Sequence, residues 1–128
     1  MHSIRLLSSL GLWLVSTIAV VQCYRDYNCA QDMVISSADV RAAHKRAVSR
    51  INNPSTDNKF PINIQYRGNI TPTANPAYYW YVTQLTDSQG RAGMKYYLLT
   101  SASGDILGMI STGWGRYLGT SDTWCTKA

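Results

Sequence analysis

One helical stretch followed only by strand-like stretches limits the folds open to this chain more than any other feature. Between residues 36 and 51 apolar side chains recur every three or four positions and so share one helix face; they are Val40, Ala43, Ala47, Val48 and Ile51. Ser36 or Ser37 can cap this helix, because a serine hydroxyl accepts a hydrogen bond from the exposed amides of the first turn. The Asn-Asn-Pro run at 52–54 ends it.

After the helix the pattern changes to short segments with alternating, aromatic or β-branched residues, which are typical of strands. These segments are 60–66, 78–82, 94–99, 106–111 and 114–118. Turn residues at 87–90 and 103–105 separate neighbours, so the strands should pair antiparallel. One α-helix packed on such an antiparallel β-sheet predicts a small α+β domain.

The first residues have the pattern of a secretory signal peptide. Arg5 supplies a positive charge before a mostly apolar run from Leu6 to Val21. This run is shorter than the about 20 apolar residues that a membrane-spanning helix needs. We therefore predict a signal peptide over 1–23 and one secreted domain over 24–128, with no membrane partner.

The cysteines agree with a cut after Cys23, because its removal leaves an even number. Cys29 and Cys125 lie near the two ends of the mature chain and should pair in an oxidising compartment. Closing a loop of nearly the whole domain is worth about 4–5 kcal/mol in the chain-entropy model. We therefore expect a disulfide that joins the chain ends.

Charge and aromatic content allow a polyanion as partner. Without Arg5 the chain keeps eleven Lys and Arg side chains against seven aspartates, a net charge of +4, together with nine tyrosines. A charge of this size is also ordinary for a small soluble domain, and we read the basic residues of the helix as a solvated face. No clustered ligands indicate a metal site, and no cofactor is expected.

Three short strings, in this order, resemble the secreted guanyl-specific ribonucleases of fungi. Phe60-Pro61-Ile62 resembles that family's Tyr-Pro-His, and Tyr78-Tyr79-Trp80 resembles its Tyr-Tyr-Glu. Residues 106–112 resemble its strand of the form Leu-Ala-Gly-Val-Ile-Thr-His. The resemblance covers about residues 24–126 and implies a microbial ribonuclease-like fold.

Carried over one by one, the family's catalytic positions fall on side chains without the required chemistry. The two histidines fall on Ile62 and on Thr112 (or the adjacent Gly113, if the gap is placed differently). The glutamate base falls on Trp80 and, loosely, the arginine on Lys95. Metal-free RNA cleavage needs a general base and a general acid, yet the sequence contains no glutamate. We expect His44, on the apolar helix stripe, to be packed or hydrogen-bonded; a nuclease that uses it with an aspartate is the lesser alternative. The resemblance thus implies a pseudo-ribonuclease, not an enzyme.

A second resemblance depends on the two ends of the mature chain. Tyr27-Asn28-Cys29 follows the predicted leader, and Trp124-Cys125 lies near the other end. With a ribonuclease-like body, these motifs resemble the candidate secreted effectors of powdery mildew fungi, the ribonuclease-like proteins associated with haustoria. The resemblance implies a virulence effector delivered to the cytoplasm of plant host cells to counter defence and cell death. Some members of that group are recognised by an intracellular immune receptor.

Two mechanisms stay open for a protein of this kind, which we expect to be a monomer. It can bind host RNA or ribosomes without cutting, through stacking worth about 1–3 kcal/mol per base and through positive charge. The candidate RNA-binding residues are Tyr66, Tyr78, Trp80, Lys95, Tyr97, Trp114 and Arg116, and we expect about half of the aromatic ones to be core. Alternatively the fold is a scaffold whose loops (52–59, 67–77 and 112–123) bind a host defence protein.

The segment 60–66 leaves one conflict open. Alternation puts Phe60, Ile62, Ile64 and Tyr66 on one face, which the resemblance directs to the cleft and periodicity directs to the core. Either the cleft is filled with apolar side chains, which disfavours RNA, or the strand register differs by one residue. Separately, Asn69-Ile70-Thr71 is a glycosylation sequon whose use the following proline can lower.

Overall fold

The computed structural model describes residues 24–54, 58–113 and 118–128. The predicted signal peptide, Trp114, Arg116 and most of the predicted strand 114–118 lie outside these residues. None of the helices in the described ranges is long and apolar enough to cross a membrane.

The predicted helix is confirmed as α2 (Ser37–Asn52). The Ser36 hydroxyl accepts a hydrogen bond from the Asp39 backbone N–H at 3.2 Å, as expected of a serine cap. Val40, Ala43 and Ala47 are buried, so the apolar stripe is the face that packs inward. The structure thus agrees with the sequence on both the ends and the orientation of this element.

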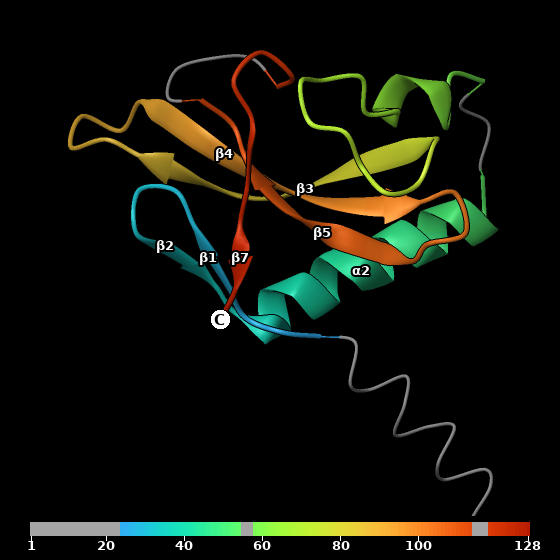
Figure 1. Cartoon of the computed structure of the whole chain (residues 1–128), viewed down its shortest axis with the longest axis horizontal. Coiled ribbons are helices and arrows are strands. Elements are labelled where there is room, and N and C mark those ends of the chain that lie inside the picture. Colours follow the sequence, from blue (N-terminus) through green and yellow to red (C-terminus); the bar gives the residue numbers. More distant parts are fainter. Residues whose placement is uncertain (1–23, 55–57, 114–117) are drawn as a thin grey trace, which may run out of the picture.

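A four-stranded antiparallel sheet lies across the helix, in the order β3-β4-β5-β6 (Figure 1). Its strands are β3 (Ala77–Thr86), β4 (Ala92–Ser101), β5 (Ile106–Ser111) and β6 (Thr123–Trp124). The first three contain the predicted segments 78–82, 94–99 and 106–111, so the antiparallel meander is confirmed. The fold is therefore α+β, with the helix against one face of the sheet.

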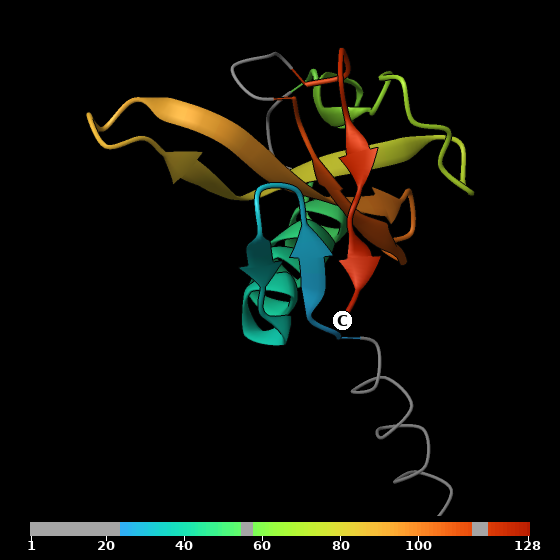
Figure 2. The same ribbon diagram turned by 60° about the vertical axis from the view of Figure 1, so that its left-hand side comes forward.

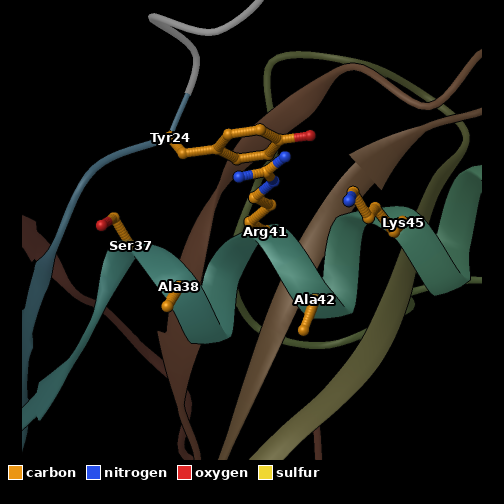
Figure 3. Close-up of a pocket in the computed structure, with 6 residues that line it drawn as sticks. All are labelled: Tyr24, Ser37, Ala38, Arg41, Ala42 and Lys45. Atoms are coloured by element: carbon orange, nitrogen blue, oxygen red, sulfur yellow. The ribbon is translucent and has the colours of Figure 1, made fainter.

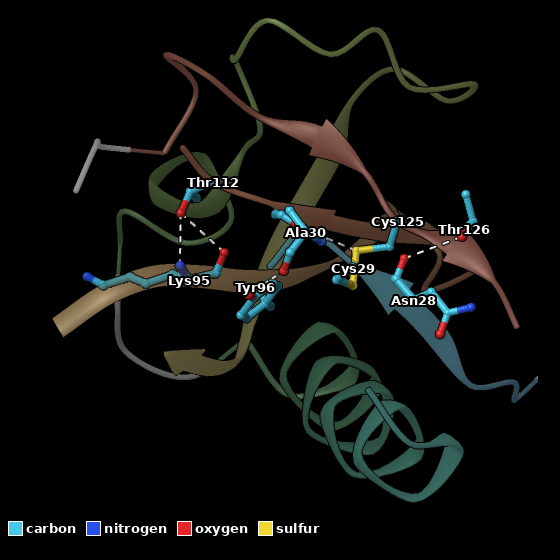
Figure 4. The surroundings of a disulfide bond; sticks show 9 residues. Asn28, Cys29, Ala30, Lys95, Tyr96, Thr112, Cys125 and Thr126 are labelled. Carbon is cyan, nitrogen blue, oxygen red and sulfur yellow. Dashed lines mark hydrogen bonds between the residues drawn. A yellow bond between two sulfur atoms is a disulfide. The ribbon is translucent and has the colours of Figure 1, made fainter. Parts of the chain in front are cut away.

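A second, three-stranded sheet in the order β2-β1-β7 was not predicted. It consists of β1 (Tyr27–Cys29), β2 (Met33–Ile35) and β7 (Thr126–Lys127), which come from the two ends of the described chain. The Cys29–Cys125 disulfide, with an S–S distance of 2.04 Å, joins the same two ends (Figure 4). The expected disulfide is thus present, and the strands form two sheets where one was predicted.

Residues 60–66 do not form the predicted strand. Ile62–Ile64 is a 3-10 turn, η1, and Ile62 is 67% exposed. The N–H groups of Asn63, Ile64 and Gln65 donate within the turn, to Lys59, Pro61 and Ile62, which leaves them unavailable to a sheet. Only Gln65 forms a bridge to β3. The alternating apolar residues therefore lie in a turn. Because no strand forms here, neither of the two registers considered from the sequence applies.

Two clusters of apolar side chains fill the two faces of the four-stranded sheet. The cluster between sheet and helix includes Val40, Ala43, Met94, Tyr96, Leu98 and Met109. The cluster on the other face includes Tyr66, Ala77, Leu99 and Ile110, with Ile70 and Leu118 packed on it. The loop segment 62–76 lies over this second face (Figures 1 and 2), whereas Phe60 just before it contacts Trp80 and Arg50 on the helix side. We call the two sides the helix face and the loop face.

Candidate nucleic-acid interface

The aromatic run at the start of β3 divides between the two faces of the sheet, because side chains alternate along a strand. Trp80 packs against the helix-face cluster and donates its indole N–H to the Thr100 hydroxyl at 2.8 Å. Tyr79 belongs to the loop-face cluster. Trp80 and Tyr78 thus share the helix face, whereas Tyr79 and Tyr81 share the loop face.

Two of the candidate RNA-binding residues, Tyr66 and Tyr78, are buried. The Tyr66 hydroxyl donates to Asp122 Oδ2 at 2.5 Å and accepts from the Ile70 backbone N–H at 3.3 Å. Burial, together with this hydrogen bond to Asp122, raises the pKa of Tyr66 well above its usual value of 10. Tyr66 therefore holds loops together on the loop face.

Three tyrosines form a compact group on the loop face, the tyrosine cluster of Tyr79, Tyr81 and Tyr97. Tyr81 and Tyr97 are directly paired across β3 and β4, with ring centroids 6.0 Å apart, and Tyr79 and Tyr97 are 5.6 Å apart. Both pairs are close to perpendicular, which suits the charge distribution of aromatic rings. Burial and the neighbouring tyrosines raise the pKa of Tyr97. Tyr81 is 48% exposed, so the cluster offers aromatic surface to a ligand.

Lys95 lies on the same face as Tyr97, two residues away along β4. Its backbone is fixed to Thr112: the Lys95 N–H donates to the Thr112 hydroxyl at 2.9 Å, and the Thr112 N–H donates to the Lys95 carbonyl at 2.9 Å. Figure 4 shows the Lys95 side chain leading away from the disulfide. The candidates Lys95 and Tyr97 are thus brought together on the loop face.

The four positions that match the ribonucleases' catalytic residues do not gather at one place. Lys95 and Thr112 are neighbours, but the Thr112 hydroxyl is used in backbone pairing and the residue is buried. Ile62 lies on the exposed η1 turn, and Trp80 lies on the helix face. These four side chains therefore do not line a common cleft.

A cavity of about 340 Å³ lies beside the tyrosine cluster. Its lining consists of Gln65, Tyr66, Arg67, Gly68, Tyr79, Leu118 and Gly119. Arg67 is exposed and donates to the Gln65 side-chain oxygen at 3.2 Å. Arg67, Tyr79 and Tyr81 were not among the residues that sequence reasoning selected. Had the pairing of Tyr97 with Tyr81 been known, the alternation of side chains along β3 would have placed Tyr79 and Tyr81 on the same face as Tyr97.

His44 is hydrogen-bonded through both ring nitrogens, as the sequence led us to expect. Its Nε2 is 2.7 Å from the Gly104 carbonyl oxygen, which can only accept, so Nε2 carries the proton. In the neutral ring, Nδ1 accepts from the Tyr24 hydroxyl at 2.8 Å. The imidazole links the N-terminal segment, α2 and the β4–β5 turn, on the side of the sheet away from the tyrosine cluster.

The sequon residue Asn69 is also engaged. Its side-chain amide donates to the Asp122 carbonyl at 3.0 Å, and its side-chain oxygen accepts from the Asp122 N–H at 2.8 Å. A glycan would replace one of the two hydrogens on this nitrogen and would have to fit beside Asp122.

Within the described ranges no three His, Cys, Asp or Glu side chains come together as a metal site would require. Comparisons of the chain with protein-family models, with curated proteins and with solved structures find no match.

Proposed function

We propose that this protein is a secreted, catalytically inactive ribonuclease-like effector that acts in plant host cells by binding RNA, or ribosomes, without cutting it. The observation that carries the proposal is the tyrosine cluster on the loop face, with Lys95 beside it. This surface belongs to the same side of the sheet as the apolar cluster around Tyr66 and the cavity next to Arg67. Export and the host compartment are taken from the resemblance to the mildew effectors.

The chemistry of the loop face suits single-stranded RNA. A base stacked on an exposed tyrosine contributes about 1–3 kcal/mol and needs no particular sequence. Lys95 and Arg67 supply charges that can meet phosphates on either side of the stacked bases. The cavity between Arg67 and Tyr79 lies at the small end of ligand pockets, which begin at about 300 Å³.

Three observations support binding without cleavage. The sequence offers no glutamate as a general base. The nitrogens of His44 are both hydrogen-bonded, on the opposite side of the sheet from the tyrosine cluster. The carboxylate nearest the tyrosine cluster, that of Asp122, already accepts hydrogen bonds at Oδ2 from the Tyr66 hydroxyl and the Gly119 N–H.

The test is a titration of the oxidised domain, residues 24–128, with a single-stranded RNA of about ten nucleotides, at low and physiological salt. The RNA is checked for cleavage afterwards. We expect micromolar binding of intact RNA, weakened roughly 5- to 150-fold by Tyr81→Ala. Val34→Ala, which shortens an exposed apolar side chain on the three-stranded sheet, is the control. Lys95→Gln should weaken RNA binding more at low salt than at physiological salt. Lys127→Gln, on the three-stranded sheet, should leave RNA binding unchanged at both.

Two results would overturn the proposal. Cleavage that His44→Ala abolishes would make the protein an active nuclease. Weak binding seen only at low salt, and insensitive to Tyr81→Ala, would remove RNA as the ligand.

That second result would favour a scaffold that binds a host defence protein or an immune receptor through its loops. The observation for this alternative is Ile62, an isoleucine 67% exposed on a turn that projects from the loop segment. Single exposed apolar residues are common on protein surfaces, so Ile62 supports this reading less than the tyrosine cluster supports RNA. Ile62→Asp would then be the variant to compare in a pull-down with host proteins.

A further inference from the structure

The outward side of α2 carries two rows of positive charge. At 100° per residue, Arg41 and Lys45 lie along one flank of the helix, and Arg46 and Arg50 lie along the other. We call these four residues the basic helix face. The strip between the rows consists of small side chains, namely Ala38, Ala42 and Ser49. Asp39 is the one acidic residue among those of α2.

Two shallow hollows follow this strip. One, of about 630 Å³, is lined by Tyr24, Ser37, Ala38, Arg41, Ala42 and Lys45 (Figure 3). The next, of about 480 Å³, is lined by Lys45, Arg46, Ser49, Arg50 and Asn53. Lys45 lines both, so the two hollows adjoin along the helix, and we call them together the trough. Small residues on its floor allow a bulky ligand to approach the helix backbone closely.

The two rows differ in how their charges are held. Arg46 donates from Nη2 to the Tyr81 carbonyl at 3.1 Å, and the Arg50 guanidinium lies 4.5 Å from the centre of the Phe60 ring. Both are therefore anchored at one side. Arg41 and Lys45 form no hydrogen bond or ion pair with any residue of the described ranges. Their charges are exposed to solvent and unneutralised.

We propose that the basic helix face binds the phosphate backbone of double-stranded RNA. The proposal rests on the proposed function only in taking RNA as the polyanion. Residues four apart on a helix are separated by about 6 Å along its axis, a spacing similar to that of successive phosphates on one strand. Two rows of cations can meet the two phosphate rows that border a groove of an RNA duplex. Duplex RNA is recognised mainly through its shape and backbone.

The surface lacks what single-stranded RNA would need. Tyr24 is the aromatic residue at the trough, and its hydroxyl is bound to His44 while its ring lies edge-on to the imidazole. Stacking bases would have to displace those contacts. The sheet separates this trough from the tyrosine cluster, so the two faces are suited to duplex and single-stranded segments respectively. A folded RNA with both kinds of segment could occupy both faces.

The experiment compares a short blunt RNA duplex with a single-stranded RNA of the same length, using the oxidised domain of residues 24–128. Arg41→Gln and Lys45→Gln each remove one exposed charge, and the control Arg91→Gln changes the net charge equally by removing a guanidinium that is paired with Asp87 at the distant β3–β4 turn. Affinity falls as salt rises, so a plot of log affinity against log salt has a negative slope. For each lost phosphate contact we expect this slope to become shallower by about 0.9, and the duplex affinity at 0.1 M salt to fall roughly eightfold. Arg91→Gln should change neither, and single-stranded binding should stay at its original strength in all three variants.

Several outcomes would overturn the inference. Equal losses for Arg41→Gln and Arg91→Gln would mean attraction by net charge alone. An unchanged duplex affinity in the double variant Arg41→Gln/Lys45→Gln would remove the helix face as a duplex site. Binding to phosphatidylserine vesicles with none to the duplex would make it a membrane surface. Failure of the proposed function is distinguishable, because it removes single-stranded binding that depends on Tyr81 and leaves the duplex result unaffected.

Discussion

The hydroxyl of Tyr66 provides a sharp test of how the loop face is assembled. The ring is 7% exposed and packs among Ala77, Leu99 and Ile110, contacts that a phenylalanine keeps. Only the hydroxyl differs, and it connects to Asp122, which belongs to another loop. Tyr66→Phe therefore removes a hydrogen bond between two loops and leaves the apolar packing in place.

The size of the effect follows from what Asp122 retains. Its Oδ2 keeps the Gly119 backbone N–H at 2.8 Å, whereas its buried Oδ1 has no hydrogen-bond partner among the described residues. A hydrogen bond to a charged group contributes about 1.5–3 kcal/mol, and a buried carboxylate that loses a donor is poorly compensated. We expect Tyr66→Phe to lower the free energy of unfolding by about 2–3 kcal/mol. For a domain of this size that corresponds to a Tm lower by about 10–20 °C.

Urea unfolding of the oxidised domain measures this cost, with Tyr81→Phe as the control. Tyr81 is on the sheet surface and should lose less than about 0.5 kcal/mol. A double-mutant cycle of Tyr66→Phe with Asp122→Ala, which removes the acceptor, should give a coupling energy of about 1–2 kcal/mol, because the two groups are in direct contact. A cost of Tyr66→Phe equal to that of Tyr81→Phe, or a coupling near zero, would show that this reasoning about the loop face is wrong.

Four further predictions concern stability. Burial raises the pKa of Tyr66, Tyr27 and Tyr96 above the usual 10, so the native state keeps protons that the unfolded state releases; the free energy of unfolding should fall as the pH rises above about 10, and Tyr66→Phe should make the slope shallower. Reduction of the Cys29–Cys125 bond, which spans 96 residues, should cost about 4–5 kcal/mol, and equal urea midpoints for the oxidised and reduced forms would contradict this. Gly68→Ala would put a methyl group 2.5 Å from the Gly119 Cα and should cost at least about 1–3 kcal/mol by thermal unfolding. Gly90→Ala, with nothing within 4 Å but a φ of +80°, should cost about 1 kcal/mol, measured in the same way.

The elements that the sequence predicted are those whose signal is local. Helix α2 has an apolar stripe, a serine cap and a stop at Pro54, and each is a property of neighbouring residues. Strands β3, β4 and β5 have aromatic or β-branched runs between turns. For these elements tertiary contacts reinforce the local preference.

The second sheet could not be predicted, because its strands are too short to have a periodicity. Strands β1 and β2 have three residues each and β7 has two. Tyr27 pairs with Lys127, a partner from the other end of the chain. The sequence showed that the ends meet, through Cys29 and Cys125, but not that they form a sheet.

The strand predicted at 60–66 was wrong for the opposite reason: this segment has the local alternation of a strand, but it folds as a turn. Ile62 and Ile64 alternate with asparagine, as in a strand, but Pro61 has no N–H for a sheet and the following N–H groups bond within the turn. At the site, β3 was ambiguous because every residue from Tyr78 to Tyr81 is aromatic. Alternation cannot tell which pair faces the helix when both pairs have the same character.

One exposed hydrogen bond connects the two proposed surfaces. Arg46 of the basic helix face donates to the backbone carbonyl of Tyr81, whose side chain belongs to the tyrosine cluster. Tyr81 lies on β3, an edge strand of the four-stranded sheet, next to an irregularity in its pairing with β4. Because this contact is exposed, water can replace the guanidinium at the carbonyl, and withdrawal of Arg46 toward a phosphate should cost at most about 1 kcal/mol. Arg46 can therefore contact a phosphate on its own flank of the helix, while Arg41 and Lys45 contact the phosphates on the other flank.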